Sequence, residues 1–97
     1  MEVTPPAGMF VPGRFTVVIP TLNEGAMLVM TTHSVVSDIG DDDVEVIVVD
    51  DGSTDGSTAW YERYPSPHVR VVRASHLGVA RARNLGASHA TGEYLVF

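Results

Sequence analysis

The chain has 97 residues, of which 44% are hydrophobic, and it carries a formal net charge of −6. This length fits one small domain, and the acidic balance argues against nucleic acid as a partner, because such binding depends on neutralising many phosphates. No apolar run approaches the roughly 20 residues that cross a bilayer, and neither a secretory signal nor a cysteine is present, so we expect a soluble, cytoplasmic protein without a membrane segment.

Charge is divided unevenly along the chain. Residues 1–60 hold ten of the twelve acids and a single cation, Arg14, whereas residues 61–97 hold two acids and five arginines. A planar guanidinium suits bidentate contact with phosphate, and solvated surface arginines would give the same count. The sequence therefore allows a small anionic ligand in the second half of the chain.

The N-terminal third predicts an arm followed by a strand and a helix. Residues 1–14 are rich in proline and glycine without an apolar period, which is typical of a flexible arm. Residues 15–20 are mostly β-branched and apolar, as in a strand buried on both faces of a parallel sheet. Asn23 can cap a helix that ends near Gly40 and whose apolar positions recur at helical spacing, at Leu28, Val35, Val36 and Ile39.

The same alternation continues to the end of the chain. Strands are expected at residues 44–49, at 69–72 and from 94 onward, with helices at 57–64 and 77–90. On the last helix, one face is predicted to pack closely through Val79, Ala82 and Gly86. The pattern predicts an α/β fold with a Rossmann-like β-α-β-α-β-α-β order and a parallel sheet, whose ligand lies at the carboxyl ends of the strands.

Three stretches at successive strand ends carry a family resemblance. Residues 18–24 read VIPTLNE, residues 48–55 read VVDDGSTD, and residues 78–84 read GVARARN before GEYLVF closes the chain. In order and spacing they resemble family 2 glycosyltransferases of the GT-A fold. The resemblance implies that residues 15–97 are the truncated, N-terminal nucleotide-binding portion of a GT-A domain in an inverting enzyme that uses a nucleotide-sugar donor, with a UDP-sugar as the default.

The resemblance also implies what this stretch lacks. The Asp-x-Asp motif that holds a divalent metal, Mg²⁺ or Mn²⁺, and the carboxylate base that activates the acceptor are expected beyond Phe97. We therefore expect no catalytic and no metal-binding residue in this chain, and no activity from it alone. The sugar and the acceptor stay open, and an uncovered edge at the fourth strand would allow self-association.

Six residues are candidate nucleotide ligands: Pro20, Thr21, Glu24, Asp50, Asp51 and Arg83. At the end of the first strand, Pro20 leaves no amide proton unpaired and the Thr21 hydroxyl can meet a base or ribose, or else make a local hydrogen bond. Glu24 could accept from a ribose hydroxyl, although an acid in the first turn of a helix is also an ordinary stabiliser.

The paired acids at the end of the second strand have two possible roles. A carboxylate there can accept from the imide N–H of uracil, or it can cap a turn through Asx-type hydrogen bonds. The resemblance favours Asp51 for the base, while for Asp50 both roles stay open. Gly52 is expected to supply a permissive backbone conformation and Asp55 to cap the next helix.

Two arginines compete for the anionic part of the ligand. Arg81 and Arg83 are two residues apart, about 200° around a helix, so only one of them can face a ligand. Arg83 matches the Ala-Arg-Asn of the family and is the candidate for the pyrophosphate or base, with Arg81 as the alternate.

Two other function classes compete with the enzyme. Asp51 to Glu62 has the ligand spacing of an EF-hand calcium loop, but the preceding residues predict a strand where that loop needs a helix. A receiver-like signalling domain would need an Asp at the end of its third strand and a later Lys, and this sequence contains no Lys. The four histidines show no ligand-like spacing, and Trp60, Tyr61 and Tyr64 indicate packing.

Overall fold

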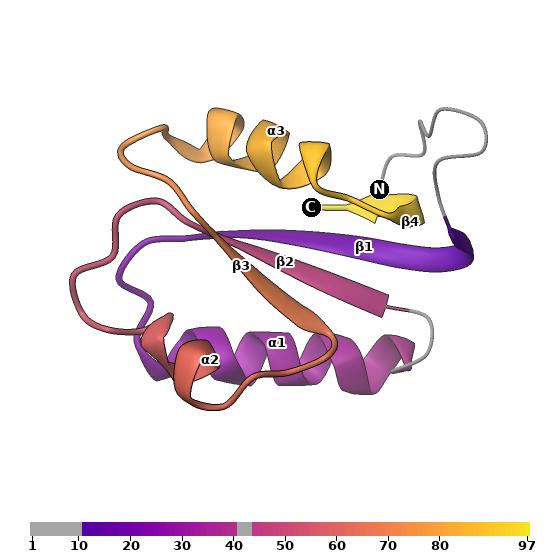
Figure 1. Ribbon diagram of the computed structural model, residues 1–97, viewed down its shortest axis with the longest axis horizontal. Helices are drawn as coiled ribbons and strands as arrows, with labels where there is room; N and C mark the ends of the chain where they lie inside the picture. Colours follow the sequence, from indigo (N-terminus) through magenta and orange to yellow (C-terminus); the bar gives the residue numbers. More distant parts are fainter. Residues whose placement is uncertain (1–10, 41–43) are drawn as a thin grey trace.

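The computed structural model describes residues 11–40 and 44–97, in which strands and helices alternate without exception. The elements are β1 (Val11–Thr21), α1 (Ala26–Ile39), β2 (Val44–Asp50), α2 (Ala59–Arg63), β3 (Val69–Arg73), α3 (Val79–Ser88) and β4 (Gly92–Val96). All strand pairs are parallel and the strand order is β3-β2-β1-β4. Helices α1 and α2 cover one face of the sheet and α3 covers the other (Figure 1). The predicted α/β fold with a parallel sheet is confirmed.

Strand β2 forms the centre of the core because it is buried on both faces. Val44, Val46 and Val48 are fully buried against the α1 side of the sheet, and Ile47 and Val49 against the α3 side. Full burial of such a side chain contributes roughly 1.5–3 kcal/mol to folding. The continuous apolar run of β2, which predicted a doubly covered strand, therefore holds the two layers of helix together.

Helix α1 packs through the face that its sequence predicted. Leu28 is buried, and Val35, Val36 and Ile39 pack against the same cluster of strand residues. The helix begins later than expected, however, at Ala26 with Gly25 as its N-cap residue. Asn23 adopts a left-handed backbone conformation with φ 53° and makes no cap, so the predicted capping role of Asn23 is wrong.

Strand β1 begins before the expected Phe15. Val11 is paired with Gly92 of β4, and the register between these strands shifts between Val11 and Phe15. This pairing draws the last residues of the predicted 1–14 arm into the sheet, while residues 1–10 of that arm lie outside the described part of the chain. Strand β4 is at one edge of the sheet, and the predicted self-association through that edge stays a prediction.

The approach of α3 to the sheet depends on small residues. Ala82 and Gly86 are buried as predicted, but Val79 is 58% exposed, since it is the first residue of the helix and lies in an exposed stretch, residues 78–81, before the helix reaches the sheet at Ala82. A Cβ at position 86 would lie 2.3 Å from Val18 Cγ1 and 3.0 Å from Val49 Cγ2. Glycine at this position therefore sets the distance between α3 and the sheet.

Within the described residues, none of the helices has both the length and the apolar content that a bilayer-spanning segment needs.

Replacing Gly86 by alanine tests this close approach. Alanine favours a helix over glycine by about 1 kcal/mol, but overpacking costs about 1–3 kcal/mol, so we expect Gly86→Ala to lower the free energy of unfolding by up to about 2 kcal/mol. Urea denaturation measures the change. The control Arg81→Ala, on an exposed position of the same helix, should stay within about 0.5 kcal/mol of the parent. A Gly86→Ala chain more stable than the parent would show that α3 is not held this closely.

Candidate functional site

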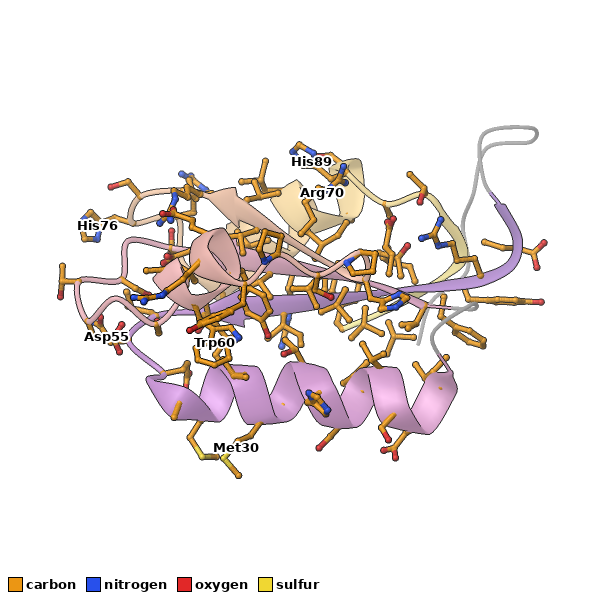
Figure 2. All side chains as sticks on the ribbon, turned by 60° about the horizontal axis from the view of Figure 1, so that its bottom comes forward. Met30, Asp55, Trp60, Arg70, His76 and His89 are labelled. Carbon is orange, nitrogen blue, oxygen red and sulfur yellow. The ribbon has the colours of Figure 1, made fainter. Side chains whose placement is uncertain are left out.

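The loops that follow β1, β2 and β3 meet at the carboxyl edge of the sheet, on the left in Figure 1. The Asp51 amide donates to the Thr21 carbonyl at 3.0 Å, and the Ala74 amide donates to the Asp50 carbonyl at 2.7 Å. Figure 2 places Asp55 and His76, from the second and third of these loops, at this same end of the molecule. The chain thus gathers its loops where parallel sheets bind ligands.

Asp50 organises the start of its own loop. Its Oδ1 accepts from the amides of Gly52 at 3.2 Å and Ser53 at 2.8 Å, while its Oδ2 accepts from the Thr58 hydroxyl and lies 3.4 Å from Arg73 Nη1. Burial alone would raise the pKa of Asp50, but the hydrogen bonds from Thr58, Ser53 and Gly52 outweigh burial and hold that pKa below its ordinary value. The carboxylate is therefore committed to turn formation, which is the second of the two roles considered for it.

Asp51 connects its loop to the one before α3. Its Oδ1 accepts from the Leu77 amide at 2.8 Å and its Oδ2 from the Gly78 amide at 2.9 Å. Each carboxylate oxygen has a second lone pair, so the group can still accept from a ligand. Gly52, directly after it, has a φ of 107°, as expected for a permissive residue.

Asn23 and Asp55 join the first loop to the second. Asn23 Oδ1 accepts from the amides of Thr54 at 2.8 Å and Asp55 at 3.2 Å, and Asp55 Oδ2 accepts from the Gly25 amide at 3.0 Å. Asp55 Oδ1 accepts from the Ser57 amide at 2.9 Å, within the turn before α2 rather than at the Thr58 N-cap position. Of the two side chains that were predicted to cap helices, Asn23 thus acts across loops, and Asp55 acts both across loops and within its own turn.

Three of the six candidate ligands line one hollow. Pro20, Thr21 and Glu24 surround a space of about 190 Å³ together with Ile19, Met27, Leu28 and Thr31. Thr21 is 3% exposed, and its hydroxyl has no hydrogen-bond partner among the described residues. A buried hydroxyl without a partner costs about 1–3 kcal/mol, so a ligand that hydrogen-bonds it would recover stabilisation.

The pleat of the sheet separates Thr21 from Asp51. Successive residues of a strand point to opposite faces, and Thr21 is in register with Asp50, on the α1 side. Asp51 points instead toward the loop before α3. A single ligand can meet both side chains only by lying across the end of the sheet.

Arg83 stands apart from the other candidates. Arg81 and Arg83 are both exposed on α3, and neither forms an ion pair with the described residues. Ala82 between them is buried, which places the two guanidinium groups on opposite flanks of the helix, as their spacing predicted. The role of Arg83 toward a ligand stays a prediction.

Sequence reasoning missed the contribution of Arg73. Its guanidinium hydrogen-bonds the Thr58 hydroxyl at 3.3 Å and forms ion pairs with Asp50 and Glu62. Arg73 is in register with Asp50 on the neighbouring strand. The contact between Arg73 and Asp50 could therefore be predicted only from the pairing of β2 with β3, which would have to be known first.

The described residues do not form a metal site. In the ranges 11–40 and 44–97, no group of three or more His, Cys, Asp or Glu side chains is arranged to hold an ion. Asp50 and Asp51, the carboxylates nearest the strand ends, already accept from backbone amides. The EF-hand alternative is wrong, because strand β2 precedes Asp51 where a calcium loop needs a helix.

Comparison with known proteins identifies the family. The model of the family described as "Glycosyl transferase family 2" matches residues 16–97. The chain belongs to glycosyl transferase family 2. This membership displaces the receiver-like alternative, and the predicted GT-A resemblance is confirmed.

Relatives of this family 2 chain are glycosyltransferases of greater length. The uncharacterized glycosyltransferase YibD of Escherichia coli strain K12 is 34% identical over 86 residues, which cover 87% of this chain and 25% of YibD. Glycosyltransferase GlyG of Streptococcus pneumoniae serotype 4 is 36% identical over 83 residues, covering 82% of this chain and 27% of GlyG. The chain thus spans about a quarter of the length of these curated relatives.

Solved structures agree with the family 2 assignment. The mannosyltransferase PcManGT from Pyrobaculum calidifontis, in complex with GDP-Man and Mn²⁺, matches with a TM-score of 0.73 and 35% identity over 84% of this chain and 26% of PcManGT. Staphylococcus aureus TarS 1–349 matches with a TM-score of 0.67 and 30% identity, again over 84% of this chain and 26% of the other. The observed layers are therefore those of GT-A glycosyltransferases.

The acid sensitivity of the family 2 chain tests the role of Asp50. The pKa of Asp50 is lower in the folded chain than in the unfolded chain, so the ionised carboxylate stabilises the fold. This stabilisation is complete above the unfolded-state pKa of about 3.9 and is lost as pH falls through the folded-state pKa. We expect Asp50→Asn to lower the free energy of unfolding by about 1–3 kcal/mol at pH 7, with the deficit shrinking as the pH approaches 3.

Denaturant unfolding at a series of pH values measures this deficit. The control Asp38→Asn makes the same chemical change at an exposed position on α1 and should have little effect at any of these pH values. A deficit for Asp50→Asn that does not depend on pH would contradict the account.

Proposed function

We propose that this chain binds the nucleoside part of a nucleotide-sugar donor at the carboxyl edge of its sheet, as part of a glycosyltransferase. The observation that carries the proposal is Thr21, which lines a hollow with Pro20 and Glu24 and whose buried hydroxyl has no partner among the described residues. Membership of family 2 supports a sugar transfer reaction, and GDP-Man bound to PcManGT supports a nucleotide-sugar as donor.

Each predicted ligand has a distinct role in this proposal. The Thr21 hydroxyl donates to or accepts from the base or ribose, and the exposed Glu24 carboxylate accepts from a ribose hydroxyl. Asp51 accepts a hydrogen bond from a ring N–H of the base through its remaining lone pairs. Pro20, at the end of β1, lies next to the base. Asp50 contributes through the shape of its loop, and Arg83 supplies positive charge toward the pyrophosphate.

The donor that we propose to test first is a UDP-sugar. The imide N–H of uracil and the ring amide N–H of guanine can each donate to a carboxylate, so Asp51 itself favours neither base. The GDP-Man complex of PcManGT makes a GDP-sugar the second candidate.

Inversion at the anomeric carbon is the reaction course that we propose, with the acceptor hydroxyl attacking the face opposite the leaving nucleoside diphosphate. The described residues of this chain bind and orient the donor in this proposal, and none of them acts as the base. A divalent metal would stabilise the charge of the leaving diphosphate when it is bound. The residues described here do not form its site, so it would need ligands from outside them. Inactivity of the 97-residue chain alone and a cytoplasmic location stay predictions.

Replacing Thr21 by valine tests the proposal, because valine keeps the shape and removes the hydroxyl. In the chain without ligand, the buried hydroxyl has no partner and costs free energy of folding, so the variant should be as stable as the parent or more stable. Affinity for the nucleotide should fall about 2- to 12-fold, the equivalent of one net hydrogen bond of about 0.5–1.5 kcal/mol. Calorimetric titration of the chain with UDP and with GDP measures the affinity, and thermal unfolding measures stability.

The matched control is Thr54→Val, an identical change at an exposed position of the loop after β2, which should leave both quantities unchanged. Nucleotide binding that is equally strong in the parent and in Thr21→Val would contradict the proposed site. Absence of binding by the parent to UDP, GDP and their sugar conjugates would contradict the proposed function as a whole.

A further inference from the structure

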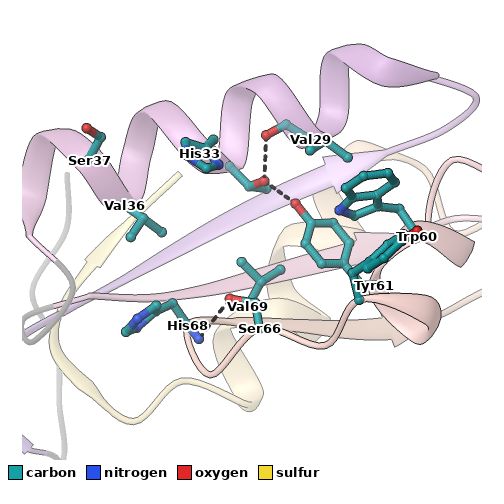
Figure 3. Close-up of a pocket in the computed structure, with 11 residues that line it drawn as sticks. Val29, His33, Val36, Ser37, Trp60, Tyr61, Ser66, His68 and Val69 are labelled. Atoms are coloured by element: carbon teal, nitrogen blue, oxygen red, sulfur yellow. Dashed lines mark hydrogen bonds between the residues drawn. The ribbon is translucent and has the colours of Figure 1, made fainter.

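A second cleft lies between α1 and the segment that joins α2 to β3 (Figure 3). It has a volume of about 500 Å³, within the roughly 300–1,000 Å³ that is usual for small-molecule sites. Its lining consists of Val29, Thr32, His33, Val36 and Ser37 of α1, Trp60, Tyr61 and Tyr64 in and after α2, and Ser66, His68 and Val69. None of these residues belongs to the candidate nucleotide site, so the cleft is a separate feature.

The lining of this cleft carries no acid, lysine or arginine. The chain as a whole holds twelve acids and six arginines, so a lining of eleven residues without any of them stands out from the rest of the molecule. A phosphate or carboxylate bound here would find no lysine or arginine in the lining, only the imidazoles of His33 and His68, and a cationic ligand would find no acid. The chemistry of the lining therefore favours an uncharged ligand that can hydrogen-bond to imidazole and hydroxyl groups.

Trp60 gives the cleft an exposed aromatic surface. Its side chain is 47% exposed, and its ring centroid lies 4.5 Å from that of Tyr64. The guanidinium of Arg63 lies 5.8 Å from the centroid of the Tyr64 ring, so Tyr64 interacts with both Trp60 and Arg63. An indole is a large apolar surface with one polar N–H, which suits a ligand that has apolar C–H faces and hydroxyl edges.

Hydrogen-bonding groups flank that aromatic surface. The Thr32 hydroxyl donates to the Val29 carbonyl at 3.0 Å and is hydrogen-bonded to the Tyr61 hydroxyl, which fixes α2 against α1 (Figure 3). His33 and Ser37 are exposed on the α1 side of the cleft, and their imidazole and hydroxyl groups both donate and accept. A rigid wall thus combines an aromatic face with neutral donors and acceptors.

We propose that this cleft binds a neutral oligosaccharide, with one sugar ring lying on the Trp60 indole and hydroxyl groups of the saccharide along α1 bonded to His33 and Ser37 (Figure 3). A pyranose ring presents apolar C–H groups on its faces and hydroxyls around its rim, which matches a lining that combines aromatic rings with hydroxyl and imidazole groups and has no acid, lysine or arginine. The site holds the saccharide without any covalent step. The proposal does not depend on nucleotide binding at the strand ends, since the two sites share no residue.

Tryptophan fluorescence tests this proposal directly, because Trp60 is the single tryptophan of the chain. The 97-residue chain is titrated with cellotetraose, maltotetraose, mannotetraose and chitotetraose, all of which are uncharged. We expect at least one of them to change the emission saturably, with a dissociation constant of about 1 mM or below. UDP, which carries phosphate, should leave the emission change of that saccharide undiminished when both are present.

Variants locate the binding. Calorimetric titration with the saccharide that binds should show at least about a tenfold loss of affinity for Trp60→Ala and for Ser37→Tyr, which fills the cleft. Met30→Ala is the matched control, because Met30 is 62% exposed on the same helix and does not line the cleft (Figure 2). Circular dichroism checks that each variant is folded, and Ser37→Tyr keeps the test valid if Trp60→Ala unfolds.

Four results would overturn the proposal. They are binding of none of the tetrasaccharides, binding that both cleft variants retain, a preference for sulfated or carboxylated sugars over neutral ones, and self-association in sedimentation that Trp60→Ala abolishes. The last result would show that a second copy of the chain covers this surface. None of them bears on UDP or GDP binding, so failure here is distinguishable from failure of the proposed function.

Discussion

The arrangement of the candidate site depends on two adjacent carboxylates at the end of the central strand. Asp50 accepts from the amides of its own loop, and Asp51 accepts from the amides of Leu77 and Gly78 in the next one. Unpaired amides at these turns would be costly if they were buried, and one carboxylate satisfies two of them. Because β2 is covered on both faces, these groups are held at the end of the most deeply buried strand of the sheet. The sheet thus fixes the carboxylates, and the carboxylates fix the loops.

This arrangement divides the strand-end edge into parts with different chemistry. On the α1 side, Thr21 lines a hollow and has an unpartnered buried hydroxyl, while on the α3 side Asp51 uses its oxygens to hold a loop. A nucleoside that lies across the edge of the sheet would meet both sides. The uncharged cleft between α1 and α2 offers instead an aromatic face and neutral hydrogen-bonding groups. The two surfaces differ in chemistry, and we propose a nucleotide as the ligand of the first and a neutral sugar as the ligand of the second.

The sequence predicts the layers of this fold well, because they follow from local periodicity. Leu28 and Val36 pack where helical spacing places them, and the apolar run of β2 is buried on both faces. The contacts between loops could not be predicted in the same way. Asn23 looks like a helix cap in sequence, yet it binds amides more than 30 residues away, and Arg73 meets Asp50 only through strand pairing. Such contacts depend on strand order and register, which no local pattern determines.

Amide hydrogen exchange in the loop before α3 tests the central claim most directly. The account predicts that the amides of Leu77 and Gly78 are protected in the parent chain and lose that protection in Asp51→Ala. The amides of Gly52 and Ser53, which Asp50 holds, should keep theirs in the same variant. Exchange at Leu77 and Gly78 that is the same in both chains would show that Asp51 does not hold this loop, and the account of the site would fail.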